Sequence, residues 1–310
     1  MPLPNFLMIG AAKAGTSSLF SYLGQHPDVF ISGTKEPNYF AVAGTRVNYA
    51  GPGDRIVNQT SVTDLARYEA LFHSVRGESA VGEASTLYLY LPAAAAHIRR
   101  MLPGARLIAI LREPVDRAYS SYLHMTRDGR EPLASFEAAL ADEDARVEAN
   151  WEPLWYYSRL GFYYGQLRRY YDLFPPEQIR VCLYEDFDQN PGEVVRSLFA
   201  FLGVDPTFAP DMSIRHKVAG TPRSATLHAL LSQPNPAKAV AKRVLPSSVR
   251  SRLYAAMMRG NIVAHKDDLS PKTREALRQR YAADIERLAC LIRRDLSAWL
   301  PAGGRQGEPT

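Results

Sequence analysis

Lysine, serine and threonine side chains gather in a short turn near the start of the chain, where they could bind a phosphate group. The apolar run Asn5 to Ile9 predicts a buried strand before this turn, and helical spacing follows it. A strand, a turn of small residues and a helix N-terminus present backbone N–H groups and the positive end of the helix dipole to one point. We therefore predict an anion site formed by Lys13, Ala14, Gly15, Thr16, Ser17 and Ser18.

The position of the lysine separates this turn from the phosphate loop of nucleotide triphosphatases. In that loop the lysine follows the second glycine and the next Ser or Thr holds magnesium, whereas here Lys13 precedes Gly15. The predicted strand Leu107 to Leu111 ends in Arg112, where a nucleotidase would place an acidic metal ligand. We predict a phosphate site without a metal. A P-loop kinase or nucleotidase is the enzymatic alternative, which magnesium-dependent nucleotide binding would favour.

A second anion site is predicted at Arg112. It opens the segment Arg-Glu-Pro-Val-Asp-Arg-Ala-Tyr-Ser, which places Ser120 about two turns into the following helix. Ligands of open α/β sheets bind at the carboxyl ends of the strands, so Lys13 and Arg112 should face the same crevice. Two anion sites in one crevice imply a ligand with two separated phosphates.

Strand-length apolar runs alternate with helical patterns along the chain. Runs that are apolar on successive residues indicate strands buried on both faces, and their alternation with helices predicts an α/β fold, with a central parallel sheet between helices in three layers. With 46% hydrophobic residues among 310, the chain is neither disordered nor fibrous, and we predict one domain over residues 1–300 with a flexible tail over 301–310. The further strands are predicted at Ala80 to Gly82, Arg106 to Leu111 and Ile179 to Tyr184.

Several helix ends are predicted from capping preferences. They are Thr63 as the cap of a helix over Asp64 to His73, Pro92 and Pro191 in first turns, Gly203 as a stop, and Ser270-Pro271 at the start of a last helix that reaches about Leu296.

Cys182 and Cys290 both lie in apolar runs and are predicted to be buried free thiols, which indicates a reducing compartment. The apolar stretch at the N-terminus lacks a charged leader, and no run approaches the roughly 20 apolar residues that span a bilayer. We therefore expect a cytoplasmic protein.

Basic residues are concentrated between Met212 and Lys266, a stretch with no Asp or Glu. Such a stretch favours an anionic partner, for example a phosphorylated cofactor, an acidic acceptor or a membrane face. Residues 237–266 contain one aromatic residue, Tyr254, so they lack the interleaved aromatics of a single-strand nucleic-acid binder. The alternative from a different functional class is a non-catalytic module that binds a membrane surface through 237–266. An enzyme could also use this segment to contact a membrane that holds its acceptor, and the third interpretation is a solvated basic surface.

At these motifs the sequence resembles sulfotransferases that use 3'-phosphoadenosine 5'-phosphosulfate (PAPS), in particular the branch of bacterial single-domain enzymes and heparan sulfate sulfotransferases. Residues 13–18 match the 5'-phosphosulfate loop of that family, and Arg112 with Ser120 matches the pair that holds the 3'-phosphate. The segment Lys35-Glu36-Pro-Asn-Tyr-Phe is similar to the K-E-x-x-[FY]-F element, whose glutamate is the catalytic base in the glycan branch. Later segments of the chain also resemble the family, so that the resemblance covers roughly residues 5–300.

The resemblance implies PAPS as co-substrate, adenosine 3',5'-bisphosphate (PAP) as product, no metal, and a small-molecule or carbohydrate acceptor sulfated on a hydroxyl or an amine. It places Tyr184, before Glu185-Asp186, near the adenine, and assigns Lys217 and Gly220 to a 3'-phosphate loop that this chain matches loosely. Where the heparan enzymes have a lysine after the glutamate, this chain has Ala84, so that acceptor-side contact is missing.

Lys13 is expected to stabilise the leaving oxygen and Glu36 to act as the base. Enclosure by Pro37, Tyr39 and Phe40 would desolvate Glu36 and raise its proton affinity. The alternative is a surface glutamate paired with Lys35. The reserve bases, none with an acidic partner by spacing, are His26, His124 and His216, and the aromatic run Trp151 to Tyr171 is predicted to be mostly core with edges facing an acceptor.

Overall fold

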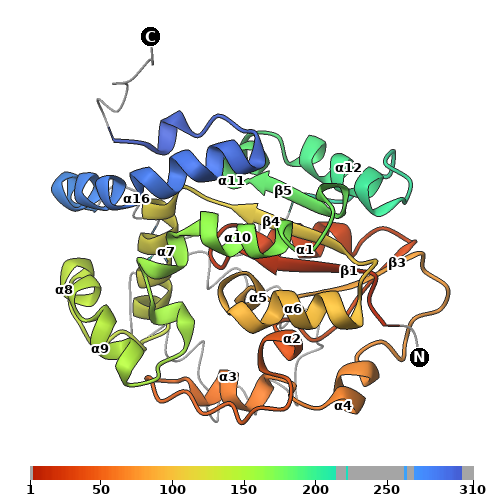
Figure 1. Ribbon diagram of the computed structural model, residues 1–310, viewed down its shortest axis with the longest axis horizontal. Coiled ribbons are helices and arrows are strands. Elements are labelled where there is room, and N and C mark those ends of the chain that lie inside the picture. Colours follow the sequence, from red (N-terminus) through yellow and green to blue (C-terminus); the bar gives the residue numbers. More distant parts are fainter. Residues whose placement is uncertain (1–2, 214–220, 223–261, 264–268, 302–310) are drawn as a thin grey trace, which may run out of the picture.

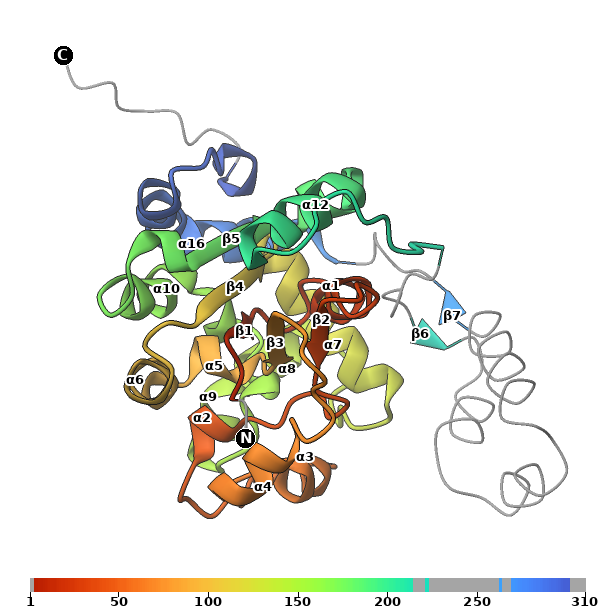
Figure 2. The same cartoon turned by 90° about the vertical axis from the view of Figure 1, so that its right-hand side faces the viewer.

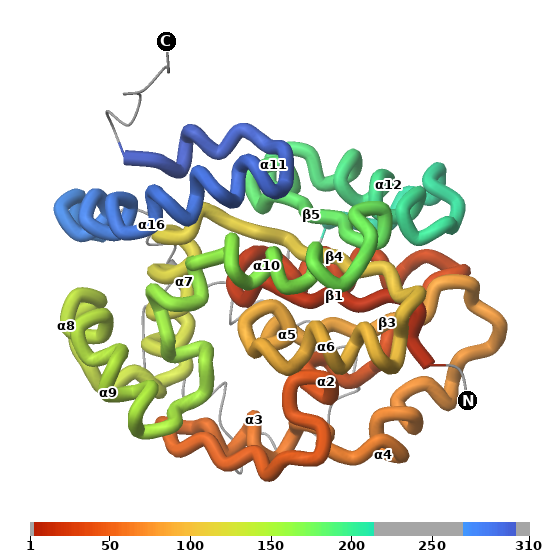
Figure 3. Tube along the Cα trace, viewed as in Figure 1, coloured from red at the N-terminus to blue at the C-terminus, as the bar shows by residue number. Residues whose placement is uncertain are grey.

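A parallel five-stranded sheet forms the centre of the protein in the computed structural model, which describes residues 3–213, 221–222, 262–263 and 269–301 (Figure 1). The strand order is β2-β3-β1-β4-β5, so β1 lies between β3 and β4, as the Cα trace also shows (Figure 3). Met8 of β1 is in register with Ala84 of β3 and Ile108 of β4. The strands are β1 Phe6–Gly10, β2 Val29–Ile31, β3 Ala80–Ala84, β4 Arg106–Leu111 and β5 Ile179–Leu183.

Helices cover both faces of this sheet, which confirms the predicted α/β fold (Figure 2). On one face α1 (Thr16–Leu23) packs against α12 (Pro191–Leu202). On the other face α10 (Tyr163–Tyr171) packs against α5 (Leu87–Tyr90) and α6 (Pro92–Met101). The long helix α16 (Pro271–Ile292) packs on α10 and on α7 (Pro114–Arg127).

Shorter elements complete the described part of the chain. A two-stranded antiparallel ribbon contacts α7 through its first strand. The short helices and the ribbon strands are α2 Tyr39–Val42, α3 Arg55–Thr60, α4 Leu65–Ala70, α8 Phe136–Ala141, α9 Glu143–Glu148, α11 Tyr184–Gln189, β6 Thr221–Pro222 and β7 Ile262–Val263.

Most predicted strands and helix ends are confirmed. Pro92, Pro191 and Pro271 open their helices, and Gly203 ends α12 in the left-handed conformation, at φ 77°. Strand β2 was not predicted, because three residues are too few to give a pattern.

Three helix ends and one cysteine were predicted wrongly. The cap of α4 is Asp64, whose Oδ1 accepts a hydrogen bond from the backbone of Arg67 at 3.0 Å, and not Thr63; this helix ends at Ala70. The last helix ends at Ile292, because Arg293 adopts a left-handed φ of 53°. Cys182 is buried in β5 as predicted, but Cys290 is exposed on α16; both thiols are free.

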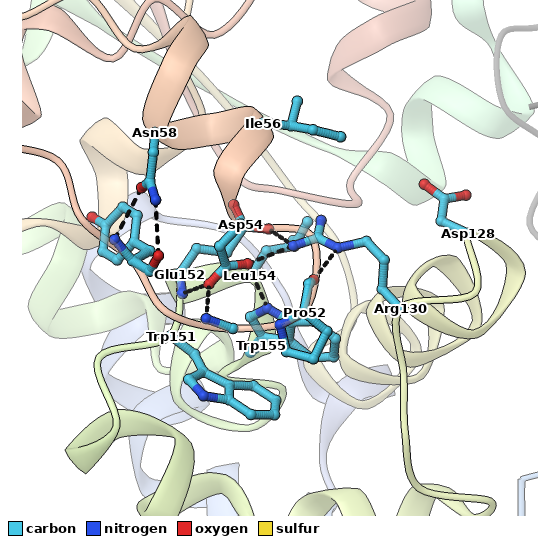
Figure 4. A network of polar contacts seen from close by, with 12 residues as sticks. Pro52, Asp54, Ile56, Asn58, Asp128, Arg130, Trp151, Glu152, Leu154 and Trp155 are labelled. Carbon is cyan, nitrogen blue, oxygen red and sulfur yellow. Dashed lines mark hydrogen bonds and ion pairs between the residues drawn. The ribbon is translucent and has the colours of Figure 1, made fainter. Parts of the chain in front are cut away.

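The connection between α2 and α4 is fixed by a buried carboxylate, Asp54 (Figure 4). Asp54 accepts hydrogen bonds from the backbone of Gly51 and Glu152, the indole of Trp155, and the guanidinium of Arg130 at 2.5 Å. Arg130 also donates to the Glu152 carboxylate at 2.7 Å. Because a buried charge is tolerated only when paired and hydrogen-bonded, this cluster holds the connection against the segment that follows α9.

Within the described residues, no helix is long and apolar enough to cross a membrane. The aromatic run from Trp151 to Tyr171 is largely core, as predicted, and Trp155, Tyr157, Tyr163 and Tyr170 are fully buried.

Candidate active site

The carboxyl ends of all five parallel strands carry the candidate site residues. The phosphate loop with Lys13 follows β1, Glu36 lies five residues beyond β2, and Thr86 follows β3. Arg112 follows β4 directly, and Tyr184 follows β5. Because parallel strands end at one edge of a sheet, residues that are far apart in the sequence meet there.

The loop after β1 has the geometry of an anion-binding turn. Gly15 is the N-cap residue of α1, with a φ of 94°, and no side chain caps the first turn of the helix. Lys13 is half-buried and also adopts a positive φ of 68°. A glycine is required at position 15, because a Cβ there would lie 3.1 Å from the Tyr184 ring in a conformation that other residues rarely adopt. An uncapped helix N-terminus leaves its donors to a ligand.

Arg112 joins this loop to Tyr184. Its guanidinium carbon lies 4.7 Å from the centroid of the Tyr184 ring, and its Nη1 donates to the backbone carbonyl of Lys13 at 3.4 Å. The hydroxyl of Tyr163 holds the Arg112 carbonyl at 3.1 Å. The structure thus brings together the residues predicted to bind two phosphates, and Ser120 is buried in the second turn of α7, the helix that follows Arg112.

Glu36 lies beside the phosphate loop and is linked to it by Lys35. The Nζ of Lys35 donates to Ser17 Oγ at 2.8 Å and lies 3.6 Å from Glu36 Oε1. The other oxygen, Glu36 Oε2, accepts hydrogen bonds from the backbone N–H and the hydroxyl of Thr86, at 2.7 Å and 3.1 Å. Lys35 was named from the sequence within the K-E-x-x-[FY]-F element and as a partner of Glu36, and the structure shows that pair, but its contact with the phosphate loop was not predicted. Thr86 was not singled out, because it has no signal apart from its position next to a strand end.

The expected enclosure of Glu36 is wrong. Its side chain is 32% exposed, while Tyr39 and Phe40 turn away into the core. Tyr39 stacks on Tyr68 with ring centroids 4.4 Å apart, and Phe40 packs edge-on against the same ring. Because these two aromatic side chains pack in the core, they do not cover Glu36. Solvent and an acceptor can therefore reach its carboxylate.

A second carboxyl, Glu83 of β3, lies fully buried behind this turn. Burial raises its pKa to about 7, and the neighbouring negative charge of Glu36 adds to this rise. Sequence reasoning assigned it no role. The sequence did contain a signal for such a role, because Glu83 lies within the apolar strand Ala80–Ala84 and a buried carboxyl group rarely lacks a function.

The histidines and the remaining predicted residues lie elsewhere. The reserve base His26 is buried, and its ring nitrogens are hydrogen-bonded to the backbone of Asp205 and Asp28, so its role is structural. For His124 no acidic partner was expected from the sequence, but the structure supplies one. Its Nδ1 lies 3.6 Å from the carboxylate of Asp128, one helical turn further along the chain. His216, Lys217, Gly220 and, apart from the two residues of β7, the segment 237–266 lie outside the described residues.

Comparisons with known proteins agree with this geometry. A profile described as the sulfotransferase family matches residues 4–209. A sulfotransferase from Alicyclobacillus acidocaldarius, of known crystal structure, is 39% identical and superposes with a TM-score of 0.77, covering 96% of this chain and 99% of its own. The chain therefore belongs to the sulfotransferase family, and the predicted family, fold and enzyme class are confirmed.

Curated relatives match through only part of their length. The bifunctional heparan sulfate N-deacetylase/N-sulfotransferase 3 of Mus musculus is 29% identical over 211 residues, which are 66% of this chain and 23% of the mouse protein. Carbohydrate sulfotransferase 15 of Homo sapiens is 26% identical over 255 residues, with 66% of this chain and 44% of the human protein covered. The chain thus spans less than half of these relatives.

Proposed function

We propose that this protein transfers the sulfuryl group of PAPS to a hydroxyl or amine of a small-molecule or carbohydrate acceptor and releases PAP. The observation that carries this proposal is the Lys35 contact, because one ammonium group touches both the phosphate loop, at Ser17, and the candidate base Glu36. A base and a leaving-group site held this close suit an in-line displacement.

The phosphate loop stabilises charge on the leaving group. Bound PAPS supplies an activated sulfuryl group on a phosphate leaving group. Lys13, the uncapped first turn of α1 and the Ser17 hydroxyl are placed to bind the oxygen on which negative charge develops. Arg112, whose guanidinium carbon lies over the Tyr184 ring, binds the second phosphate with its N–H groups and thereby fixes the position of PAPS in the site.

Glu36 accepts the acceptor's proton at Oε1. Thr86 fixes the opposite oxygen with two hydrogen bonds, which sets the direction of the carboxylate, and Lys35 lies on the side of Oε1 that faces the loop. A positioned carboxylate of this kind contributes about 100-fold to 10,000-fold to turnover. The partial exposure of Glu36 gives the acceptor access.

A carbohydrate acceptor is the first candidate, because the curated relatives are named for heparan sulfate and carbohydrate sulfation. A cytoplasmic location and contact of residues 237–266 with an anionic membrane stay further proposals, the latter supported by the absence of acidic residues between Met212 and Lys266.

Two measurements on the purified protein test the proposed function. Calorimetry in excess chelator should show tighter binding of PAP than of ATP; tighter ATP binding that needs magnesium would contradict a sulfotransferase. Labelled PAPS and a panel of a phenol, a steroid alcohol and a glucosamine oligosaccharide then identify an acceptor. On a hydroxyl acceptor, Glu36→Gln should lose roughly 100-fold to 10,000-fold in turnover and keep its PAP affinity. Glu193→Gln, an exposed glutamate of α12, is the matched control.

A further inference from the structure

The backbone of the turn that carries Glu36 is strained, so contacts with other segments must stabilise it. Glu36 and Asn38, on either side of Pro37, both adopt left-handed φ values, of 59° and 57°. Residues other than glycine rarely adopt this conformation, and they persist in it where surrounding contacts hold them. One such contact is the hydrogen bond from the Glu36 N–H to the carbonyl of Ala84 at 2.9 Å.

Two other backbone N–H groups of this turn donate to hydroxyl groups. The Asn38 N–H donates to Ser85 Oγ at 3.0 Å, and the Phe40 N–H donates to the Tyr88 hydroxyl at 3.4 Å. Both hydroxyls in turn donate to one carboxylate: Ser85 to Glu83 Oε2 at 2.9 Å, and Tyr88 to Glu83 Oε1 at 2.6 Å.

The direction of these hydrogen bonds depends on the charge of Glu83. A hydroxyl has a single proton, so a hydroxyl that receives an N–H and also contacts a carboxylate gives its proton to the carboxylate. A third hydroxyl, that of Tyr68, also donates to Glu83 Oε1, at 3.2 Å. An ionised Glu83 accepts all three protons, whereas a protonated Glu83 adds a competing donor and forces one hydroxyl to turn.

We propose that Glu83 is a positioning residue for Glu36: its ionised carboxylate orients the Ser85 and Tyr88 hydroxyls, which hold the strained turn over residues 36–40. This inference rests on the proposed role of Glu36 as the base. Protonation of Glu83 loosens the turn, so turnover falls as the pH drops below the pKa of Glu83.

The surroundings of Glu83 place this transition near neutral pH. Burial raises the pKa of Glu83 to about 7, against the opposing effect of hydrogen bonds from Tyr88, Ser85 and Tyr68. The charged group that contributes to the rise is Glu36, which is itself paired with Lys35. The turn is therefore ordered above this pKa and looser below it.

The variant Glu83→Gln tests the inference. Its amide keeps the shape of the side chain, but its NH2 group is a donor facing the donating hydroxyls of Tyr68, Ser85 and Tyr88. Hydrogen exchange of PAP-bound protein, read by mass spectrometry, should show roughly ten-fold less protection in peptides covering 36–42 and unchanged protection around Arg112. On the best acceptor of the panel, turnover should fall about ten-fold at pH 8 with KM nearly unchanged, and the acidic limb near pH 7 should disappear.

Glu152→Gln is the matched control, since burial also raises the pKa of Glu152 to about 7 while its partners are Asp54 and Arg130. It should leave both the exchange of residues 36–42 and the acidic limb unchanged. Tyr88→Phe provides a second variant in case Glu83→Gln does not fold. It should lose less protection and less turnover than Glu83→Gln, and its acidic limb should move to higher pH, because Glu83 loses the Tyr88 hydrogen bond that lowers its pKa.

Unchanged protection of 36–42 in both site variants would overturn the inference, as would lost protection with normal turnover and an intact acidic limb. Failure of the proposed function itself would be seen separately, as absent PAP binding or absent sulfuryl transfer in the unaltered protein.

Discussion

Replacing Arg112 by alanine removes a guanidinium whose carbon lies over the Tyr184 ring, 4.7 Å from its centroid, and whose Nη1 donates to the carbonyl of Lys13. A hydrogen bond from a charged group contributes about 1.5 to 3 kcal/mol, and each 1.4 kcal/mol is ten-fold in affinity. Loss of this donor should therefore weaken PAP binding by roughly 12-fold to 140-fold. Because the second phosphate lies away from the reacting sulfur, turnover at saturating PAPS should change little.

Calorimetric titration with PAP measures this loss directly, and two further variants make it interpretable. Arg112→Lys keeps the charge but loses the planar guanidinium and its paired N–H donors, so its affinity should lie between those of the parent and the alanine variant. Arg180→Ala removes an arginine that packs on the Phe201 ring at 5.3 Å, near the opposite end of β5, and should bind PAP normally. An alanine variant with normal PAP affinity would refute the reasoning and make Arg112 a structural partner of Tyr184.

Two predictions concern stability. Asp54→Asn should lower the free energy of unfolding by about 3 kcal/mol in denaturant titrations, because Arg130 loses one of its two carboxylate partners and keeps Glu152, while an amide at the buried position 54 adds a donor among donors. Exposed Asp172→Asn should change it little, and equal effects would contradict the role of the buried cluster. The raised pKa of Glu83, about 7 against an ordinary 4.5, means that the folded state holds a proton that the unfolded state has released, so the free energy of unfolding falls as the pH rises from 4.5 through 7. Between pH 5 and pH 8 this fall should be smaller in Glu83→Gln by about 2.5 kcal/mol, and an identical fall in both proteins would refute the assignment.

Much of the site was predictable because its signals are local. The phosphate loop lies between a strand and a helix within ten residues, and Arg112 directly follows an apolar strand, so the carboxyl-end rule for parallel sheets was enough to place them together. The prediction failed where local pattern carries little information. Strand β2 is three residues long, and the expected surroundings of Glu36 were taken from its neighbours in sequence, which in the fold point into the core.

The sequence by itself determined the fold class and located the two segments predicted to bind anions, because hydrophobic periodicity and glycine placement act over a few residues. The order of the strands in the sheet, with β1 beside β4, came from the structure. Only the tertiary structure decided how Glu36 is held. Thr86, Ser85 and Glu83 come from β3 and its end, about fifty residues further along the chain, and Tyr68 comes from α4. The hydrogen bonds among these groups form only when two separate segments pack side by side, and the burial that raises the pKa of Glu83 is a property of that packing.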